Sequence, residues 1–227
     1  MTRDNGRMPE GPSLVILREE AAQFEGRTIA HASGNVRAID AGALEGQAIV
    51  SLRSWGKHFL IELPDATLRI HFLLFGSYRI NERKEGSTPR LSLAFEDGSE
   101  LNFYACAIRY ADLDEYDWSA DVMSDQWDPA AARKKLRAAP DTLACDALLE
   151  QDWFSGVGNI IKNEVLFRIR VHPMSTVGAL PAPKLRALVE QARTYSFDFL
   201  EWKKQYVLKQ HWLAHRKTTC PRCRLPF

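Results

Sequence analysis

Hydrophobic and polar residues follow two different patterns along the chain. From about residue 28 to 112 they alternate in short runs, which is typical of β-strands. Beyond residue 129 the hydrophobic positions recur with helical spacing. The acidic, loop-like stretch at 111–129 separates the two patterns and marks a domain boundary. With 227 residues there is room for two hydrophobic cores, so an α+β chain of two domains is expected.

The first domain is predicted to be antiparallel β-structure with one flanking helix. Residues 14–24 have helical spacing and directly follow a Pro-Glu-Gly-Pro turn. Asp97-Gly98, between two alternating runs, is a hairpin signal. Strands are predicted at 59–61, 68–74, 78–80, 91–95 and 101–110.

The second domain is predicted to be helical. In its last helix, a stripe of hydrophobic residues between Leu185 and Phe199 follows the i, i+3, i+4, i+7 spacing of a core-facing surface. No stretch approaches the length of a membrane span, and no secretory leader precedes residue 30. The predicted helices lie at 129–138, 142–151, 159–168 and 183–213.

The net charge of +1 conceals two halves of opposite charge. Residues 130–227 hold 17 lysines and arginines against 8 acidic residues, whereas residues 1–129 hold 13 against 21. A basic half indicates a polyanionic partner, although the two halves could instead attract each other. The last 27 residues favour the polyanion, because they contain seven basic residues and only one acidic residue, Glu201. The four cysteines form no disulfide framework in a chain of this length, which favours a reducing, intracellular setting.

The run Met8–Ser13 reads MPEGPS. If Met8 is removed, the chain begins Pro9-Glu10, and a free N-terminal proline is a secondary amine that is partly neutral near pH 7. Such an amine can attack a carbonyl-like carbon and form an iminium, while the adjacent carboxylate moves protons. An internal proline cannot do so, because its nitrogen belongs to an amide. Since seven residues precede Met8, a catalytic N-terminus and a surface turn are both open interpretations.

A second motif, FSGVGNIIKNE, occupies residues 154–164 between two predicted helices. Gly156 and Gly158 permit a tight double turn, and Asn159 suits the start of the following helix. Exposed amides at a helix start, together with the Asn159 side chain, form a phosphate site. Most isolated motifs of this kind only cap a helix. With Lys162 and the basic half around it, contact with a DNA backbone is the better interpretation.

Taken together, MPEGP, SWGKHFL, HFLLFGSYRI and LLEQDWFSGVGNIIKNEVLFRIRVHP resemble the formamidopyrimidine-DNA glycosylase and endonuclease VIII family. The similarity runs from Met8 to the last residue. It implies a leader at 1–7, an N-terminal antiparallel β-sandwich with a flanking helix at 8–118, and a helical domain with a helix–two-turn–helix motif at 119–213. Residues 214–227 would form an incomplete zinc finger.

The resemblance also assigns roles to single residues. Pro9 would be the nucleophile that attacks the sugar C1′ atom, and Glu10 would donate and accept protons. Lys57 would contact the phosphates at the lesion and completes the predicted catalytic set. Asn159 would bind a phosphate in the two-turn motif, and Lys162 would add a DNA contact beside it.

The loop Leu73-Leu74-Phe75 matches the wedge that fills the gap when a damaged nucleotide is flipped out of DNA. An apolar wedge suits this role because it replaces lost base stacking without requiring hydrogen bonds. Without the resemblance, the same three residues would be read as buried strand. A wedge of three bulky residues in one loop is closer to the endonuclease VIII side, which favours oxidised pyrimidines.

The tail resembles the first half of a four-cysteine zinc finger, with Cys220 and Cys223 after a basic run. A second Cys-x-x-Cys pair would lie roughly 15–20 residues further on, and the sequence stops at Phe227. Two thiolates do not close a tetrahedral zinc site. His211 or His215 could add ligands, although a place in a basic helix end is the stronger interpretation. We therefore expect no organic cofactor and an empty half-site for zinc in this chain.

These features predict a base-excision-repair DNA glycosylase with abasic-site (AP) lyase activity. Its partner is expected to be double-stranded DNA with oxidised bases or abasic sites, and the protein is expected to be a monomer without membrane attachment. A bacterial-type cytoplasmic, nucleoid-associated location is expected. The alternative is a non-catalytic protein that binds damaged DNA, which applies if Pro9 is not the free N-terminus.

Overall fold

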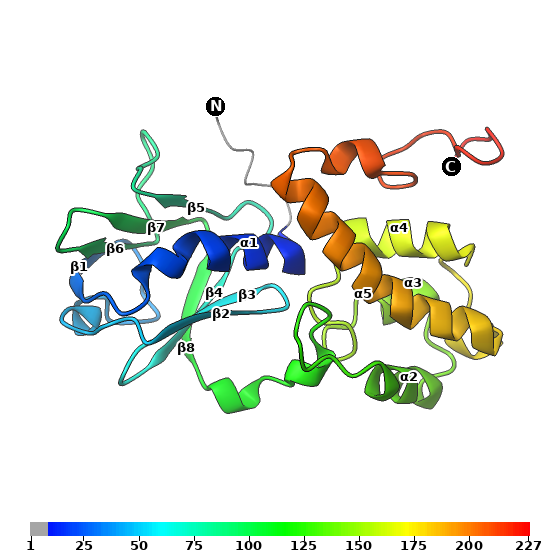
Figure 1. Cartoon of the computed structure of the whole chain (residues 1–227), viewed down its shortest axis with the longest axis horizontal. Helices are drawn as coiled ribbons and strands as arrows, with labels where there is room; N and C mark the ends of the chain where they lie inside the picture. Colours follow the sequence, from blue (N-terminus) through cyan, green and yellow to red (C-terminus); the bar gives the residue numbers. More distant parts are fainter. Residues whose placement is uncertain (1–8) are drawn as a thin grey trace. The chain divides into compact units, whose positions relative to one another are not determined.

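The structure is a computed structural model that describes residues 9–227 (Figure 1). The predicted leader at 1–7 and Met8 lie outside the described residues. The described chain forms two compact units. The first comprises Pro9 and Leu14–Tyr116, and the second comprises Glu10–Ser13 and Asp117–Phe227. The short segment around Glu10 therefore belongs to the same unit as the helices of the C-terminal half.

The first unit contains two four-stranded antiparallel sheets, with strand orders β1-β6-β7-β5 and β2-β3-β4-β8 (Figure 1). Asp97-Gly98 forms the predicted hairpin turn, because the N–H of Phe95 donates to the carbonyl of Ser99 at 2.9 Å and Gly98 has a φ of 81°. The strands are β1 (Ile29–Ser33), β2 (Ser51–Trp55), β3 (His58–Glu62), β4 (Thr67–His71), β5 (Ser77–Ile80), β6 (Leu91–Phe95), β7 (Glu100–Tyr104) and β8 (Ala107–Ala111).

A single hydrophobic core joins both sheets to helix α1 (Gly11–Ala21). Leu17 of α1 is buried in the same cluster as Phe59 of β3 and Phe103 of β7. The rings of Phe59 and Phe103, from different sheets, lie 6.1 Å apart between centroids. This common core confirms the predicted antiparallel β-sandwich with a flanking helix.

Two predicted strands end earlier than the hydrophobic pattern indicated. The predicted strand at 101–110 is interrupted at Ala105, whose φ is 49°, and its two parts enter different sheets as β7 and β8. The predicted strand at 68–74 ends with β4 at His71. A turn follows in which Leu73 has a φ of 55°, and a Cβ atom at Gly76 would collide with the carbonyl of Phe72. Both breaks require left-handed backbone that hydrophobicity alone does not reveal.

The second unit is built from four α-helices of its own (Figure 1). Asp128 caps the first of them by accepting the N–H of Ala130 at 2.7 Å, and Pro129 opens it with a suitable φ. The predicted apolar stripe of the last helix is buried, with Leu188 and Tyr195 at its centre. The helices are α2 (Pro129–Ala138), α3 (Ala144–Ala147), α4 (Asn159–Ile169) and α5 (Ala182–Lys204).

Two of these helices are shorter than predicted. The helix expected at 142–151 is a single turn, α3. The helix expected at 183–213 ends with α5 at Lys204, because Tyr206 adopts a φ of 62° and turns the chain. A short 3-10 helix, Leu208–His211, follows separately. Short 3-10 turns also occur at Ala22–Phe24, Gly42–Leu44, Leu113–Glu115, Trp118–Ala120 and Val177–Ala179.

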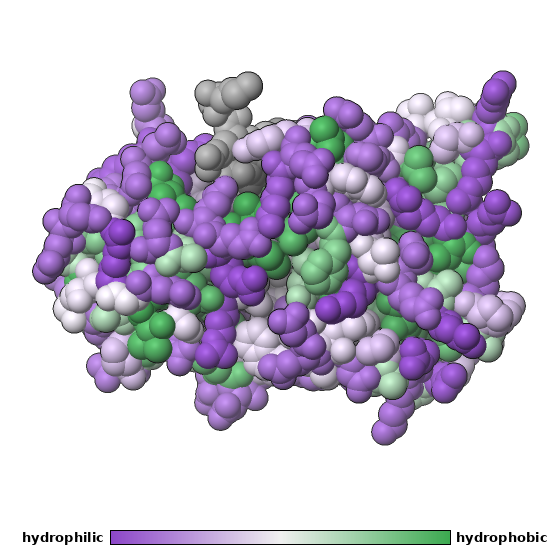
Figure 2. Space-filling view, in the orientation of Figure 1, coloured by the Kyte–Doolittle hydropathy of each residue, from purple (hydrophilic) through white to green (hydrophobic). Residues whose placement is uncertain are grey.

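Hydrophilic residues cover most of the face shown in Figure 2, with apolar residues scattered between them. Isolated apolar residues of this kind are normal on a protein surface. No helix within residues 9–227 is both long enough and apolar enough to cross a membrane.

Candidate active site

The carboxylate of Glu10 lies at the start of α4. Its Oε1 atom accepts the N–H of Ile160 at 2.7 Å, and its Oε2 atom accepts the N–H groups of Gly158 at 3.2 Å and Ile161 at 3.1 Å. The first four N–H groups of a helix have no acceptor within the helix, and here one carboxylate serves three of them. The negative charge also lies at the positive end of the helix dipole. With only 1% of its surface exposed, Glu10 is a buried cap of α4.

Two glycines allow Glu10 to reach this position. The N–H of Gly11 donates to the carbonyl of Gly156 at 2.8 Å, and Gly156 has a φ of 95°, which favours glycine. A Cβ atom at Gly158 would lie 2.6 Å from Cδ of Glu10. The double turn predicted from the two glycines therefore also provides the space in which the carboxylate is held.

Pro9 is half-buried and directly precedes this fixed segment. Because both the side chain of Glu10 and the N–H of Gly11 are bonded to residues 156–161, the chain on the carboxyl side of Pro9 is held in place. The two carboxylate oxygens of Glu10 accept the N–H groups of Gly158, Ile160 and Ile161, so the carboxylate is held next to Pro9. The roles of Pro9 as nucleophile and Glu10 as proton carrier stay predictions.

The outer side of the first turn of α4 brings together Asn159 and Lys162, both predicted to contact DNA. Asn159 is exposed, and its Oδ1 accepts the Nζ of Lys162 at 2.9 Å. Glu10 binds the N–H groups of Gly158, Ile160 and Ile161 but not that of Asn159, which no other described group accepts. A backbone donor, an amide side chain and an ammonium group therefore lie together, which is a suitable arrangement for a phosphate.

Lys57, the third residue of the predicted catalytic set, lies in the tight turn between β2 and β3, in a positively charged cluster. Burial first, and then the charges of Arg69, His71 and Lys57, lower the pKa of His58 to about 4. Burial and the charges of Lys57 and Arg69 also lower the pKa of His71, whose ring lies 5.3 Å from that of His58. Two cations beside two neutral imidazoles give a local field that favours an anion. The sequence alone did not point to Arg69, because its place in this cluster depends on the pairing of β4 with β3, in which Arg69 lies opposite Leu60.

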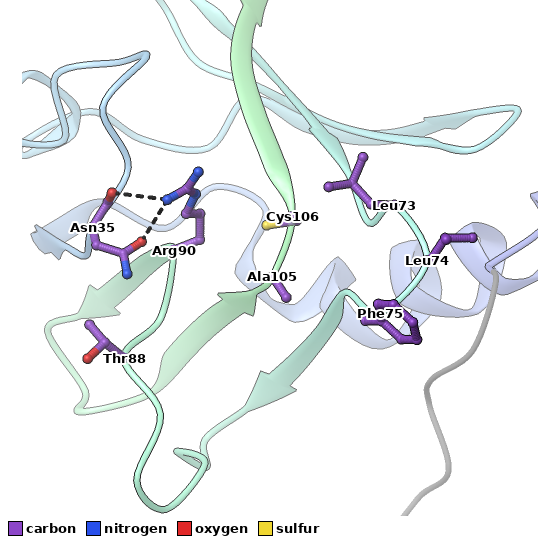
Figure 3. Close-up of a pocket in the computed structure, with 8 residues that line it drawn as sticks. All are labelled: Asn35, Leu73, Leu74, Phe75, Thr88, Arg90, Ala105 and Cys106. Atoms are coloured by element: carbon purple, nitrogen blue, oxygen red, sulfur yellow. Dashed lines mark hydrogen bonds between the residues drawn. The ribbon is translucent and has the colours of Figure 1, made fainter.

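The predicted wedge is exposed. Leu73, Leu74 and Phe75 have 52%, 58% and 73% of their surfaces accessible, which contradicts the alternative of a buried strand. They line one side of a pocket (Figure 3). The volume of this pocket is about 540 Å³. Three consecutive exposed apolar residues indicate a binding surface. The insertion of this loop into DNA stays a prediction.

Arg90 stands on the opposite side of this pocket (Figure 3). Its Nη1 atom donates to the backbone oxygen of Asn35 at 3.4 Å and to Oδ1 of Asn35 at 3.2 Å. Burial raises the pKa of the Cys106 thiol to about 12, so this cysteine at the pocket is not a reactive thiolate near pH 7. The pocket is lined by Asn35, Leu73, Leu74, Phe75, Thr88, Arg90, Ala105 and Cys106.

Cys220 and Cys223 lie in a small C-terminal hairpin. The N–H of Cys220 donates to the carbonyl of Leu225 at 2.8 Å, and the N–H of Arg224 donates to the carbonyl of Cys220 at 2.9 Å. Within residues 9–227, no three side chains of His, Cys, Asp or Glu gather as metal ligands. The cysteine pair thus resembles half of a zinc site, and the described residues do not fit a closed one.

The two histidines considered as further ligands make other contacts. The ring of His211 stacks on that of Trp202, with centroids 4.0 Å apart. His215 is buried, its Nδ1 atom lies 3.4 Å from Nδ2 of Asn163, and its ring contacts Trp212 edge-on. Both histidines therefore pack within the helical unit.

Comparisons with known proteins match two family models to this chain. The model of the formamidopyrimidine-DNA glycosylase N-terminal domain matches residues 8–106, and that of the formamidopyrimidine-DNA glycosylase H2TH domain matches residues 119–202. The DNA-(apurinic or apyrimidinic site) lyase Nei2 of Mycolicibacterium smegmatis is 30% identical over 197 residues, which are 82% of this chain and 76% of that protein. Endonuclease 8-like 2 of Bos taurus is 37% identical over 167 residues, which are 68% of this chain and 50% of that protein. The chain therefore spans about half the length of this bovine relative.

A solved structure supports the fold. The formamidopyrimidine-DNA glycosylase of Lactococcus lactis, non-covalently bound to DNA that contains an abasic site, superposes with a TM-score of 0.81. The superposition covers 96% of this chain and 92% of that one, at 20% sequence identity. The arrangement of sheets and helices described above is thus similar to that of the bacterial enzyme.

The first prediction concerns the space at Gly158. Gly158→Ala would place a Cβ atom 2.6 Å from the Glu10 side chain and displace the carboxylate from α4. We expect the free energy of unfolding to fall by about 2–4 kcal/mol, because buried N–H groups lose a charged acceptor. Urea denaturation measures this. Gly42→Ala is the control, since its added methyl would meet only Asp40 Oδ1 at 3.4 Å. Equal stability of the two variants would contradict the capping role.

The second prediction concerns pH. The pKa of His58 is lowered from 6.5 to about 4 in the folded chain. Between pH 4 and pH 6.5 the unfolded chain therefore binds more protons than the folded chain. Stability should therefore fall as the pH is lowered from 6.5 to 4, by about 2 kcal/mol from this residue alone. His58→Gln should reduce the difference in unfolding free energy between pH 7 and pH 4.5. His172→Gln, at an exposed position, should leave it unchanged. A pH dependence unaffected by His58→Gln would refute the assignment.

Proposed function

Because the chain belongs to the formamidopyrimidine-DNA glycosylase and endonuclease VIII family, we propose that it removes oxidised bases from double-stranded DNA and then cleaves the strand. The observation that supports this most directly is the fixed position of Glu10 beside Pro9, at the start of α4. The mycobacterial relative is named as a lyase, and this name agrees with the second step, cleavage of the strand. Oxidised pyrimidines are the preferred substrates in this proposal, since the relatives bear endonuclease 8 names and the wedge lies in one loop. An intracellular location follows from such a substrate.

The proposed chemistry requires Pro9 as the free N-terminus. The Pro9 nitrogen forms a bond to C1′ of the damaged nucleotide while the bond from C1′ to the base breaks, and the base leaves with a proton. Opening of the sugar ring then gives an iminium between Pro9 and C1′. The iminium makes the C2′ proton acidic, and its removal expels the 3′ phosphate and cleaves the strand. Water finally hydrolyses the iminium and restores the amine.

Glu10 would move protons during these steps. Its three hydrogen bonds to α4 hold the carboxylate in one place, so the proton carrier is positioned before the substrate arrives. The same bonds make Glu10 structurally important. Substitution of Glu10 is therefore a poor test of catalysis on its own, because it changes the proton carrier and the helix cap together.

DNA binding would use backbone contacts and one apolar loop. The first turn of α4 offers Asn159 and Lys162 to a phosphate, and the cluster around Lys57 offers a second positive site. Leu73, Leu74 and Phe75 would occupy the space that a flipped nucleotide leaves. Phosphate contacts position the protein, while the wedge and the flipped base select the lesion.

The third prediction tests the nucleophile. Protein prepared with Pro9 as its first residue should form a covalent complex with duplex DNA containing an abasic site when borohydride is present. Borohydride reduces the transient iminium to a stable amine, so the complex reports the chemistry directly. The 1–227 form with its leader retained should give none, because its Pro9 nitrogen is an amide. Equal trapping by the two forms would exclude Pro9 as the nucleophile. DNA binding without trapping by either form would support the non-catalytic alternative.

The fourth prediction separates charged from neutral phosphate contacts. Lys57→Ala should weaken binding to damaged and undamaged duplex alike and flatten the dependence of log K on log salt by about 0.9, since one counterion fewer is released. Asn159→Ala should weaken binding with little change in this slope, because Asn159 is neutral. Fluorescence anisotropy at several salt concentrations measures both, with Lys134→Ala on the exposed face of α2 as the control. An unchanged slope for Lys57→Ala would argue against its phosphate contact.

A further inference from the structure

Glu164, a second buried carboxylate, holds the chain near its C-terminus. It lies in α4 with no exposed surface. Its Oε1 atom accepts three successive backbone N–H groups, from Leu213 at 2.9 Å, Ala214 at 2.8 Å and His215 at 2.8 Å. Oε2 also lies 2.9 Å from the N–H of Leu213. Three amides that converge on one anion form a specific anchor, because each would lose a charged acceptor if the carboxylate were removed.

Neighbouring side chains of α4 strengthen this anchor on the tail, defined here as residues 211–227. Arg168 donates to the carbonyl of His211 at 3.2 Å. The ring of Phe167 lies 5.8 Å from that of Phe227, and the guanidinium of Arg222 lies 4.0 Å over the Phe167 ring. These contacts hold the tail against α4 through protein groups alone.

The tail that is held in this way is strongly basic. It carries four exposed cations and no acidic residue. Glu164, the carboxylate that holds the tail, is buried and accepts backbone N–H groups there. The positive charge of the tail therefore remains available to an external anion. The exposed cations are Arg216, Lys217, Arg222 and Arg224.

We propose that Glu164 is a positioning residue for DNA binding, which acts by holding the basic tail where its cations contact phosphates. This inference rests on the proposed function, since it states how one part of the same DNA-binding surface is held in place. Glu164 itself does not touch DNA. Its effect passes through the backbone of residues 213–215 to Arg216 and Lys217, which follow directly in the chain.

The experiment is a double-mutant cycle between the anchor and the tail cations. The anchor variant is Glu164→Gln, which keeps the shape and one oxygen but loses the charge. The tail variant combines Arg216→Ala with Lys217→Ala. Binding is measured with a labelled duplex that carries a tetrahydrofuran abasic-site analogue, for the wild type, each variant and the combination. Glu190→Gln, on the exposed side of α5, is the control for loss of one negative charge.

We expect Glu164→Gln to weaken binding about tenfold and to flatten the salt dependence, as the tail variant does. The slope of log K against log salt is proportional to the number of phosphates contacted, so fewer contacts give a shallower slope. The combined variant should bind no more weakly than the tail variant alone, because both changes remove the same contacts. The rate of borohydride trapping at saturating abasic DNA should be unchanged by Glu164→Gln. Additive losses, or a lower trapping rate with unchanged affinity, would overturn the proposal.

Hydrogen exchange provides a readout that does not depend on DNA. In Glu164→Gln the amides of residues 213–215 should lose protection, while those in the middle of α5 should keep theirs. Protection at 213–215 that is unchanged in Glu164→Gln would overturn the anchor. If the wild type fails to bind or trap DNA, the proposed function fails and the DNA role of Glu164 with it, whereas the exchange result still decides whether Glu164 holds the tail.

Discussion

The candidate site depends on one interaction, the insertion of the Glu10 carboxylate into the start of α4. It supplies acceptors for three amides that the helix cannot satisfy itself and places a negative charge at the positive end of the helix dipole. Because Glu10 is buried, these hydrogen bonds are shielded from competing water. The residue that follows Pro9 is thereby fixed by the helix whose first turn exposes Asn159. The positions of Pro9, the proposed nucleophile, and Asn159, the proposed phosphate ligand, are thus linked through a few bonds.

The same helix holds a second part of the chain by the same means. Glu10 approaches the first turn of α4 from outside, and Glu164 projects from a later turn toward residues 213–215. In both places a buried carboxylate accepts several backbone amides, an arrangement that fixes the partner segment more strictly than a single bond would. Helix α4 therefore binds both the segment at Glu10 and the segment at residues 213–215 of the second unit. Its position in the core explains why its inward residues, such as Ile161 and Val165, are fully buried.

Local signals in the sequence predicted the elements well where one residue determines the geometry. The helix predicted from Pro129 begins there as α2, and Asp97-Gly98 forms the predicted hairpin turn. The motif around Gly158 predicted a turn and a helix start, and the resemblance placed Leu73-Leu74-Phe75 in a loop, which is exposed. The capping by Glu10 was not predictable, because it joins residues about 150 positions apart. The strand break at Ala105 was hidden for a different reason, since its left-handed backbone has no glycine to reveal it.

The most direct test of this account is amide hydrogen exchange at Ile160 and Ile161, compared between the wild type and Glu10→Gln. First-turn amides of an uncapped helix exchange readily, because they have no acceptor in the helix. The account predicts strong protection of both amides in the wild type and its marked loss in Glu10→Gln, while amides in the middle of α4 stay protected. Rapid exchange of both amides in the wild type would contradict it. So would protection that survives the loss of the carboxylate charge.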